Sequence, residues 1–96
     1  MTAYSSYALS PELKRLACRQ AGPSVRAELA FEQAWQDAVS RYDKFFMDSQ
    51  RRPTTALERV EIRLSLIDKF VSCGVWQDTA RRIVDECLFD AALQVA

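Results

Sequence analysis

Apolar side chains recur every three or four residues through most of this 96-residue chain, which is the period of an α-helix with one buried face. The period is interrupted at Ala21–Pro23, at Arg52–Pro53 and at Gly74. Glycine and proline commonly end helices, because glycine adopts the left-handed cap conformation and proline cannot continue the hydrogen bonding. The spacing therefore predicts four helices, near residues 11–20, 24–50, 55–73 and 76–94.

Capping signals support these boundaries. Pro11 follows Ser10 and suits the first position of a helix, where no backbone N–H partner is needed. Thr55 and Glu58 have the spacing of a capping box, in which each side chain accepts from the backbone N–H of the other residue. These signals predict that the first and third helices begin at Pro11 and just after Thr55.

The fold class predicted by this pattern is all-α, a small antiparallel four-helix bundle with a long second helix, in one domain over residues 1–96. The chain has only two glycines and three prolines, too few for the many turns of an all-β domain. A helix near 24–50 would span about 39 Å, so we expect it to run the length of the molecule. Residues 1–9 show no period, and they either fold back onto the core through Tyr4 and Tyr7 or fray.

The third predicted helix carries two apolar stripes, whereas packing on one neighbour requires only one. The first stripe has spacings of three and four, and we expect it to face the core: Leu57, Val60, Leu64, Ile67 and Val71. The second lies about 100° or more around the helix, and we expect it to be exposed: Ile62, Leu66, Phe70 and Cys73. A second stripe that the small domain cannot cover is typical of a surface that binds a partner.

Net charge and cysteine usage restrict the class of protein. Thirteen Lys and Arg balance thirteen Asp and Glu, so the chain lacks the one-signed field of typical nucleic-acid or membrane-surface proteins. No apolar run approaches the 18 or so residues of a membrane span, and no secretory signal is visible. Three widely spaced cysteines suit a reducing compartment. We therefore expect a cytoplasmic protein.

The sequence lacks the residue patterns of common catalytic and metal sites. It contains no histidine, which is the commonest general base and metal ligand. Cys18, Cys73 and Cys87 form no C-x-x-C pair, and no glycine-rich phosphate loop is present. We expect neither an enzyme nor a cofactor or metal site.

The function that these observations favour is a protein–protein interaction module, which binds a partner protein, a second copy of itself, or both. Such a protein would be an adaptor, or an inhibitor of a bacterial or host machine of the phage or plasmid type. Aromatic residues, Met and Arg are enriched at interface centres. The residues expected to bind the partner combine the second stripe with the end of the second helix: Phe45, Phe46, Met47, Arg51, Arg52, Ile62, Leu66 and Phe70. The alternative for Arg51 and Arg52 is a solvated corner between two helices.

The alternative function is DNA binding by a helix-turn-helix with Gly74 in its turn. The recognition residues would lie at the start of the fourth helix: Gln77, Thr79, Arg81 and Arg82. Phe70 stands where that motif needs a small side chain, and the neutral net charge removes most phosphate-driven affinity. The sequence therefore favours a protein partner and makes nucleic acid the second choice.

Overall fold

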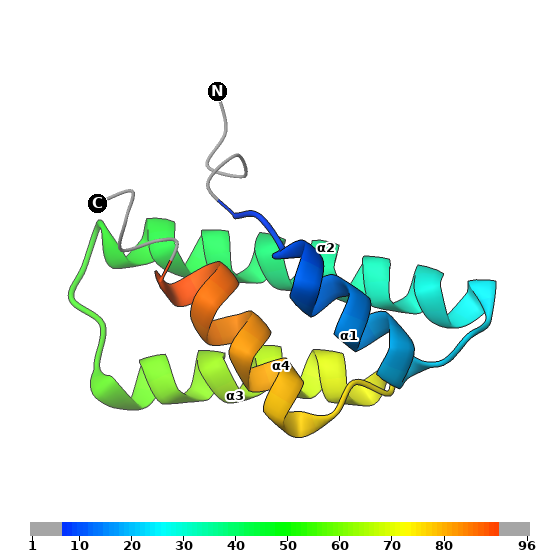
Figure 1. Ribbon diagram of the computed structural model, residues 1–96. Coiled ribbons are helices and arrows are strands. Elements are labelled where there is room, and N and C mark those ends of the chain that lie inside the picture. The colour runs from blue at the N-terminus through cyan, green and yellow to red at the C-terminus, as the bar shows by residue number, and fades with distance from the viewer. Residues whose placement is uncertain (1–6, 91–96) are drawn as a thin grey trace.

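The structure is a computed structural model that describes residues 7–90 (Figure 1). Four helices follow one another along the chain, and no strand occurs within the described range: α1 (Pro11–Ala21), α2 (Val25–Ser49), α3 (Ala56–Ser72) and α4 (Gln77–Val84). A π-helical segment, η2 (Asp85–Phe89), continues α4. The all-α prediction is confirmed. The part of the fourth predicted helix beyond residue 90 lies outside the described range.

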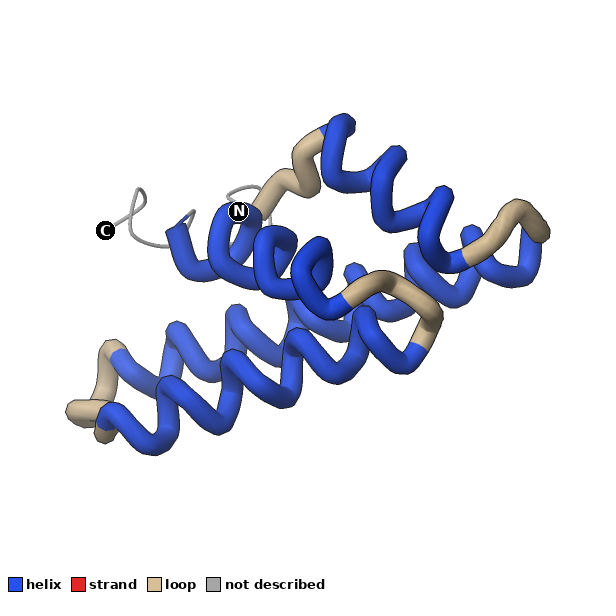
Figure 2. Tube along the Cα trace, turned by 60° about the horizontal axis from the view of Figure 1, so that its bottom comes forward, coloured by secondary structure: helices blue, strands red, loops and turns tan. Residues whose placement is uncertain are grey.

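The helices form two layers. α2 and α3 lie side by side and run in opposite directions, and α1 and α4 pack across one side of that pair (Figures 1 and 2). Each helix contacts the next one along the chain, and α1 also contacts α4. α2 has 25 residues, a length of about 38 Å, and the longest extent of the molecule is 42 Å. Because α1 and α4 cover only one side of the pair, the side of α3 that faces away from them is open to solvent.

Side-chain caps and a glycine turn fix the ends of α3. The Thr55 hydroxyl accepts from the Glu58 N–H at 3.1 Å, and the Glu58 carboxylate accepts from the Thr55 N–H at 3.0 Å, which is the predicted capping box. Gly74 has a φ of +103°, and a Cβ atom built there would lie 3.1 Å from the Cα of Ala21. Glycine is required at this turn because the backbone is left-handed and passes close to the end of α1.

The core lies between the two layers. Its largest fully buried side chains come from all four helices and from η2: Leu13, Phe31, Leu66, Phe70, Ile83, Val84 and Leu88. The rings of Phe31 on α2 and Phe70 on α3 lie 5.8 Å apart, so these two aromatic side chains join the first part of α2 to the last part of α3.

The segment before α1 is also packed where the structure describes it. Tyr7 is buried and meets Tyr42 edge to face, with 5.9 Å between ring centres. Edge-to-face contacts of this kind add to the burial of the rings. The chain therefore folds back onto α2 by residue 7, whereas Tyr4 lies outside the described residues.

The expected orientation of α3 was wrong. Leu66 and Phe70 of the second stripe are fully buried, whereas Leu57 and Leu64 of the first stripe are 67% and 56% exposed. Both stripes satisfy the helical period, so periodicity alone does not decide which one faces inward. The second stripe supplies an aromatic side chain, Phe70, whose ring packs against Phe31 at an angle of 44°. The first stripe is left on the outside, except for Ile67, which is buried as expected.

Candidate functional site

The expected partner surface does not exist as one continuous patch. Leu66 and Phe70 are 0% exposed, so a partner cannot reach them without unfolding α3. Ile62, Phe45 and Phe46 are partly buried and pack against the core. This correction removes the second stripe of α3 as a docking surface.

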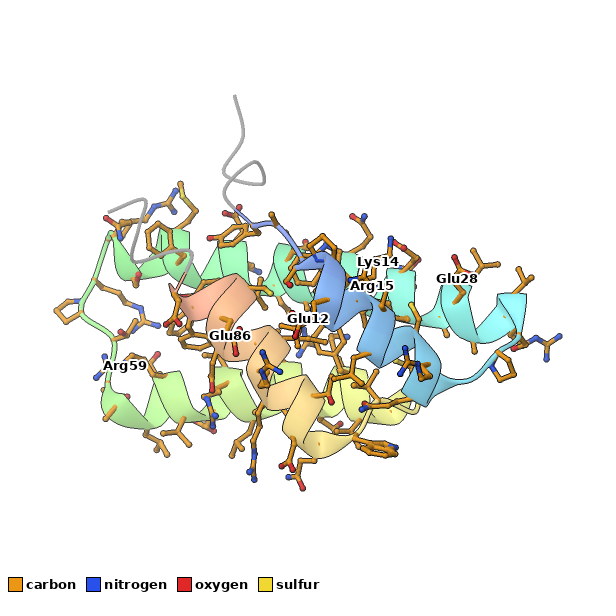
Figure 3. The ribbon with its side chains drawn as sticks, in the orientation of Figure 1. Glu12, Lys14, Arg15, Glu28, Arg59 and Glu86 are labelled. Carbon is orange, nitrogen blue, oxygen red and sulfur yellow. The ribbon has the colours of Figure 1, made fainter. Side chains whose placement is uncertain are left out.

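The corner between α2 and α3 retains part of the expected surface. Met47 is 47% exposed and Arg51 is exposed. Arg52 instead turns onto Glu58, with its Nη2 2.7 Å from one carboxylate oxygen and its Nη1 3.2 Å from the other. Arg59, at the same corner (Figure 3), donates to the Thr54 carbonyl at 3.1 Å. Arg52 therefore holds the corner together, and Arg51 is left as the outward-facing arginine of the pair.

Four of the eight large apolar side chains that are exposed in the described chain form a row on α3, which we call the α3 stripe. Its four members and their exposed fractions are Leu57 (67%), Val60 (52%), Leu64 (56%) and Val71 (39%). At 3.6 residues per turn these positions fall within an arc of roughly 60°. Leu66, at the centre of the buried face, lies about 180° around the helix from Leu57. The α3 stripe thus lies on the side of the helix away from Leu66, and its Val60 side borders the buried Ile67.

The start of the α3 stripe is held firmly by charged groups. Glu58 accepts from Arg52 and from the backbone of Thr55. The guanidinium of Arg52 and these hydrogen bonds lower the pKa of Glu58 from 4.5 to about 2. The carboxylate is therefore ionised at neutral pH. Its negative charge lies at the N-terminus of α3, where it interacts favourably with the positive end of the helix dipole.

Charges of opposite sign line the two edges of the α3 stripe. Glu61 and Asp68 lie on one edge and are exposed, and within residues 7–90 neither takes part in an ion pair. Arg63 lies towards the other edge, where its Nε and Nη2 donate to the two carboxylate oxygens of Asp85 at 2.8 and 2.9 Å. These bonds leave the second terminal nitrogen, Nη1, without a described partner. An apolar row with an acidic and a basic edge is typical of helices that pair with another helix.

A shallow groove of about 440 Å³ runs between α2 and α3 beside the acidic edge. Asp37 and Lys69 lie across it with their charged atoms 3.9 Å apart, and Asp68 and Cys73 also line it. The groove is open to solvent, and the opposite charges of Asp37 and Lys69 already compensate each other. Its chemistry gives no reason to expect a small-molecule ligand.

The described residues contain no activated nucleophile. Burial raises the pKa of the thiols of Cys18, Cys73 and Cys87 above the ordinary value, so they remain protonated at neutral pH. Between residues 7 and 90 no three His, Cys, Asp or Glu side chains come close enough to hold a metal ion. In the same range no helix has the length and apolarity that crossing a membrane requires.

The expected DNA-reading residues of α4 do not form one exposed row. Thr79 is only 4% exposed, which corrects its expected place on the surface. Arg81 lies 3.9 Å from Asp78, and Arg82 lies 3.0 Å from Glu86 of η2, which is labelled in Figure 3. Gln77 remains exposed. Each arginine of this helix thus has an acidic neighbour that would compete with a phosphate.

The chain matches no family model, no curated protein and no solved structure. The candidate site therefore depends on the geometry of α3 alone. Sequence reasoning found the members of the α3 stripe but placed them in the core. The sequence did contain a signal for the exposed side of α3. Two acidic residues, Glu61 and Asp68, alternate at spacings of four and three with three apolar members of the stripe: Leu57, Leu64 and Val71. Charges in such a row indicate a solvent-facing side.

Proposed function

We propose that this protein is a non-enzymatic interaction module, an adaptor or an inhibitor, that binds a partner protein through the α3 stripe. The observation that carries the proposal is the exposure of four large apolar side chains on the face of α3 opposite the core. A row of this size presents a patch of a few hundred Å², which is near the upper range for a monomeric protein.

Two further observations support this proposal. The capping box and the Arg52–Glu58 pair stabilise the first turn of α3, and an ordered surface loses less conformational entropy on binding than a mobile one. Burial raises the pKa of the three thiols above the ordinary value, so apolar contact, with the charges at the edges of the stripe, is the chemistry that α3 offers to a partner. We retain Met47 and Arg51 as partner residues at the adjoining corner.

A photo-crosslinking residue placed at position 64 tests the proposal in the cells from which the gene comes. The matched control is position 29, because Leu29 on α2 is also an exposed leucine, at 64% against 56% for Leu64. We expect covalent protein adducts from position 64 and none from position 29. Equal labelling from both positions, or no adduct from position 64, would contradict the proposed function.

A further inference from the structure

We propose that the partner of the α3 stripe is a second copy of this chain, bound with the two α3 helices parallel and in register. This inference rests on the proposed function and names the occupant of the same surface. It is carried by the heptad spacing of the stripe, by the signs of the charges on its edges, and by the position of the stripe relative to the core.

The spacing of the stripe is that of a helix-pairing seam. Leu57, Val60, Leu64 and Val71 are separated by three, four and seven residues, which keeps them on one line when two helices wind around each other. Ile67 completes the heptad pattern but is buried within its own chain, so the four exposed members make the contact.

The charges along the seam favour a parallel pair. Asp68 lies five residues after Arg63, and in a parallel, in-register pair the basic edge of one helix lies against the acidic edge of the other at this offset. Each copy would then place Arg63 beside Asp68 of the other copy, twice by symmetry. An antiparallel pair would instead place Glu61 and Asp68 against the acidic edge of the other copy, which is repulsive.

Arg63 is held in one position by its own chain. Asp85 holds its Nε and Nη2, so the guanidinium plane is fixed while Nη1 still has N–H groups to donate. An arginine that is positioned beforehand loses less side-chain entropy when it binds a second carboxylate.

The remaining surface of α3 limits the assembly to two chains. In isolated coiled coils, leucine at heptad position a together with a β-branched residue at position d favours tetramers. Here α2 and α4 already contact the rest of α3. One further helix fits against the free face. The seam runs from Leu57 to Val71, a length of about 21 Å. A patch of a few hundred Å² is below the roughly 800 Å² per partner of a standard interface. The dimer is therefore weak and forms at high protein concentration.

A parallel dimer has a consequence for binding further partners. Both corners between α2 and α3 would lie at the same end of the assembly, so two copies of Met47 and Arg51 would face the same direction. Two weak contacts made together bind more tightly than either one alone.

Single cysteines placed at either end of the seam test this geometry. In a Cys18→Ser, Cys73→Ser background, Leu57→Cys and Val71→Cys are oxidised separately and analysed without reductant. We expect each variant alone to form a covalent dimer, because in-register parallel helices bring each position next to its own copy, within the roughly 7 Å that a disulfide needs. The background protein and its Leu29→Cys variant should form no covalent dimer.

An antiparallel pair centred on Leu64 gives the opposite result. It would place the two copies of position 57 about 21 Å apart along the helices, because the 14 residues between positions 57 and 71 rise 1.5 Å each. Covalent dimers would then appear only when the two variants are mixed. Dimers from the mixture alone, or no dimers at all, overturn the inference.

Sedimentation equilibrium gives a second measurement that needs no cysteine. At high concentration we expect the mass to approach twice the 11.0 kDa of the chain. Leu64→Asp should return it to the monomer, whereas Leu29→Asp should not. Asp68→Arg should weaken association roughly tenfold through the two symmetric pairs. A monomeric mass at all concentrations overturns the inference, and crosslinks from position 64 to a different protein would then leave the proposed function standing.

Discussion

Leu64 and Leu66 stand two positions apart on α3 and have opposite environments. Leu66 is fully buried, whereas Leu64 is 56% exposed. Two residues correspond to about 200° of rotation, so one side chain points into the core when the other points to solvent. Whether a leucine of α3 contributes to stability or is available for binding therefore depends on its angular position around the helix axis.

This contrast gives a prediction for stability. Leu66→Ala should lower the free energy of unfolding by about 2–5 kcal/mol, because it leaves a cavity in the core. Leu64→Ala should change it by no more than about 0.5 kcal/mol, because the side chain already contacts water. Urea denaturation of dilute protein measures both values. A larger loss for Leu64→Ala than for Leu66→Ala would show that the other stripe faces inward.

At the scale of the element, polar contacts hold the first turn and the middle of α3. The capping box holds its first turn, Arg63 joins it to Asp85 at the end of α4, and Arg41 on α2 donates to the Ser65 hydroxyl. None of these contacts involves a side chain of the α3 stripe, so they hold the helix in place without covering the stripe.

The first turn of α3 should make stability depend on pH. The pKa of Glu58 is about 2 in the folded protein, against an ordinary value of 4.5. A lowered folded pKa contributes stability above the ordinary value, and this contribution is lost as the pH falls from about 4.5 to about 2. Glu58→Gln should therefore melt at a lower temperature than the natural chain above about pH 5, and the difference should disappear near pH 2.

Thermal melts by circular dichroism across this pH range measure the effect. Glu61→Gln is the matched control, because Glu61 lies on the same helix and has no ion pair within the described residues. A Glu58→Gln melting temperature equal to that of the natural chain at neutral pH would contradict the role of the Arg52–Glu58 pair.

At the scale of the whole molecule, charge is balanced both in total and locally. The chain carries thirteen basic and thirteen acidic side chains, and the arginines of α4 have acidic neighbours within 4 Å. Affinity for nucleic acid comes largely from releasing the counterions that surround the phosphates, which requires an excess of positive charge on one surface. The balance of charge therefore favours a protein partner.

We accordingly predict that micromolar protein does not bind duplex or single-stranded DNA, even at low salt. Fluorescence anisotropy of a labelled oligonucleotide measures this directly. Binding that falls steeply with salt and is abolished by Arg81→Ala with Arg82→Ala would show instead that α4 contacts DNA, because phosphate contacts give that salt dependence.

Much of the fold could be predicted from the sequence, because helix boundaries are set by local chemistry. Pro11 begins α1, Thr55 and Glu58 cap α3, and Gly74 ends the turn after it. Each of these signals acts within a few residues, through backbone hydrogen bonds or allowed φ values. The absence of histidine and of metal-binding spacings was likewise a property of the sequence alone.

Only the tertiary structure decided which side of α3 faces the core, and hence where the candidate site lies. A periodic pattern fixes the angles between side chains on one helix, but it does not fix the rotation of that helix against its neighbours. That rotation depends on contacts between residues far apart in the chain, such as Phe31 with Phe70. Burying Leu66 and Phe70 against α2 turned Leu57 and Leu64 outward, since a helix in contact with neighbours on one side presents its opposite face to solvent.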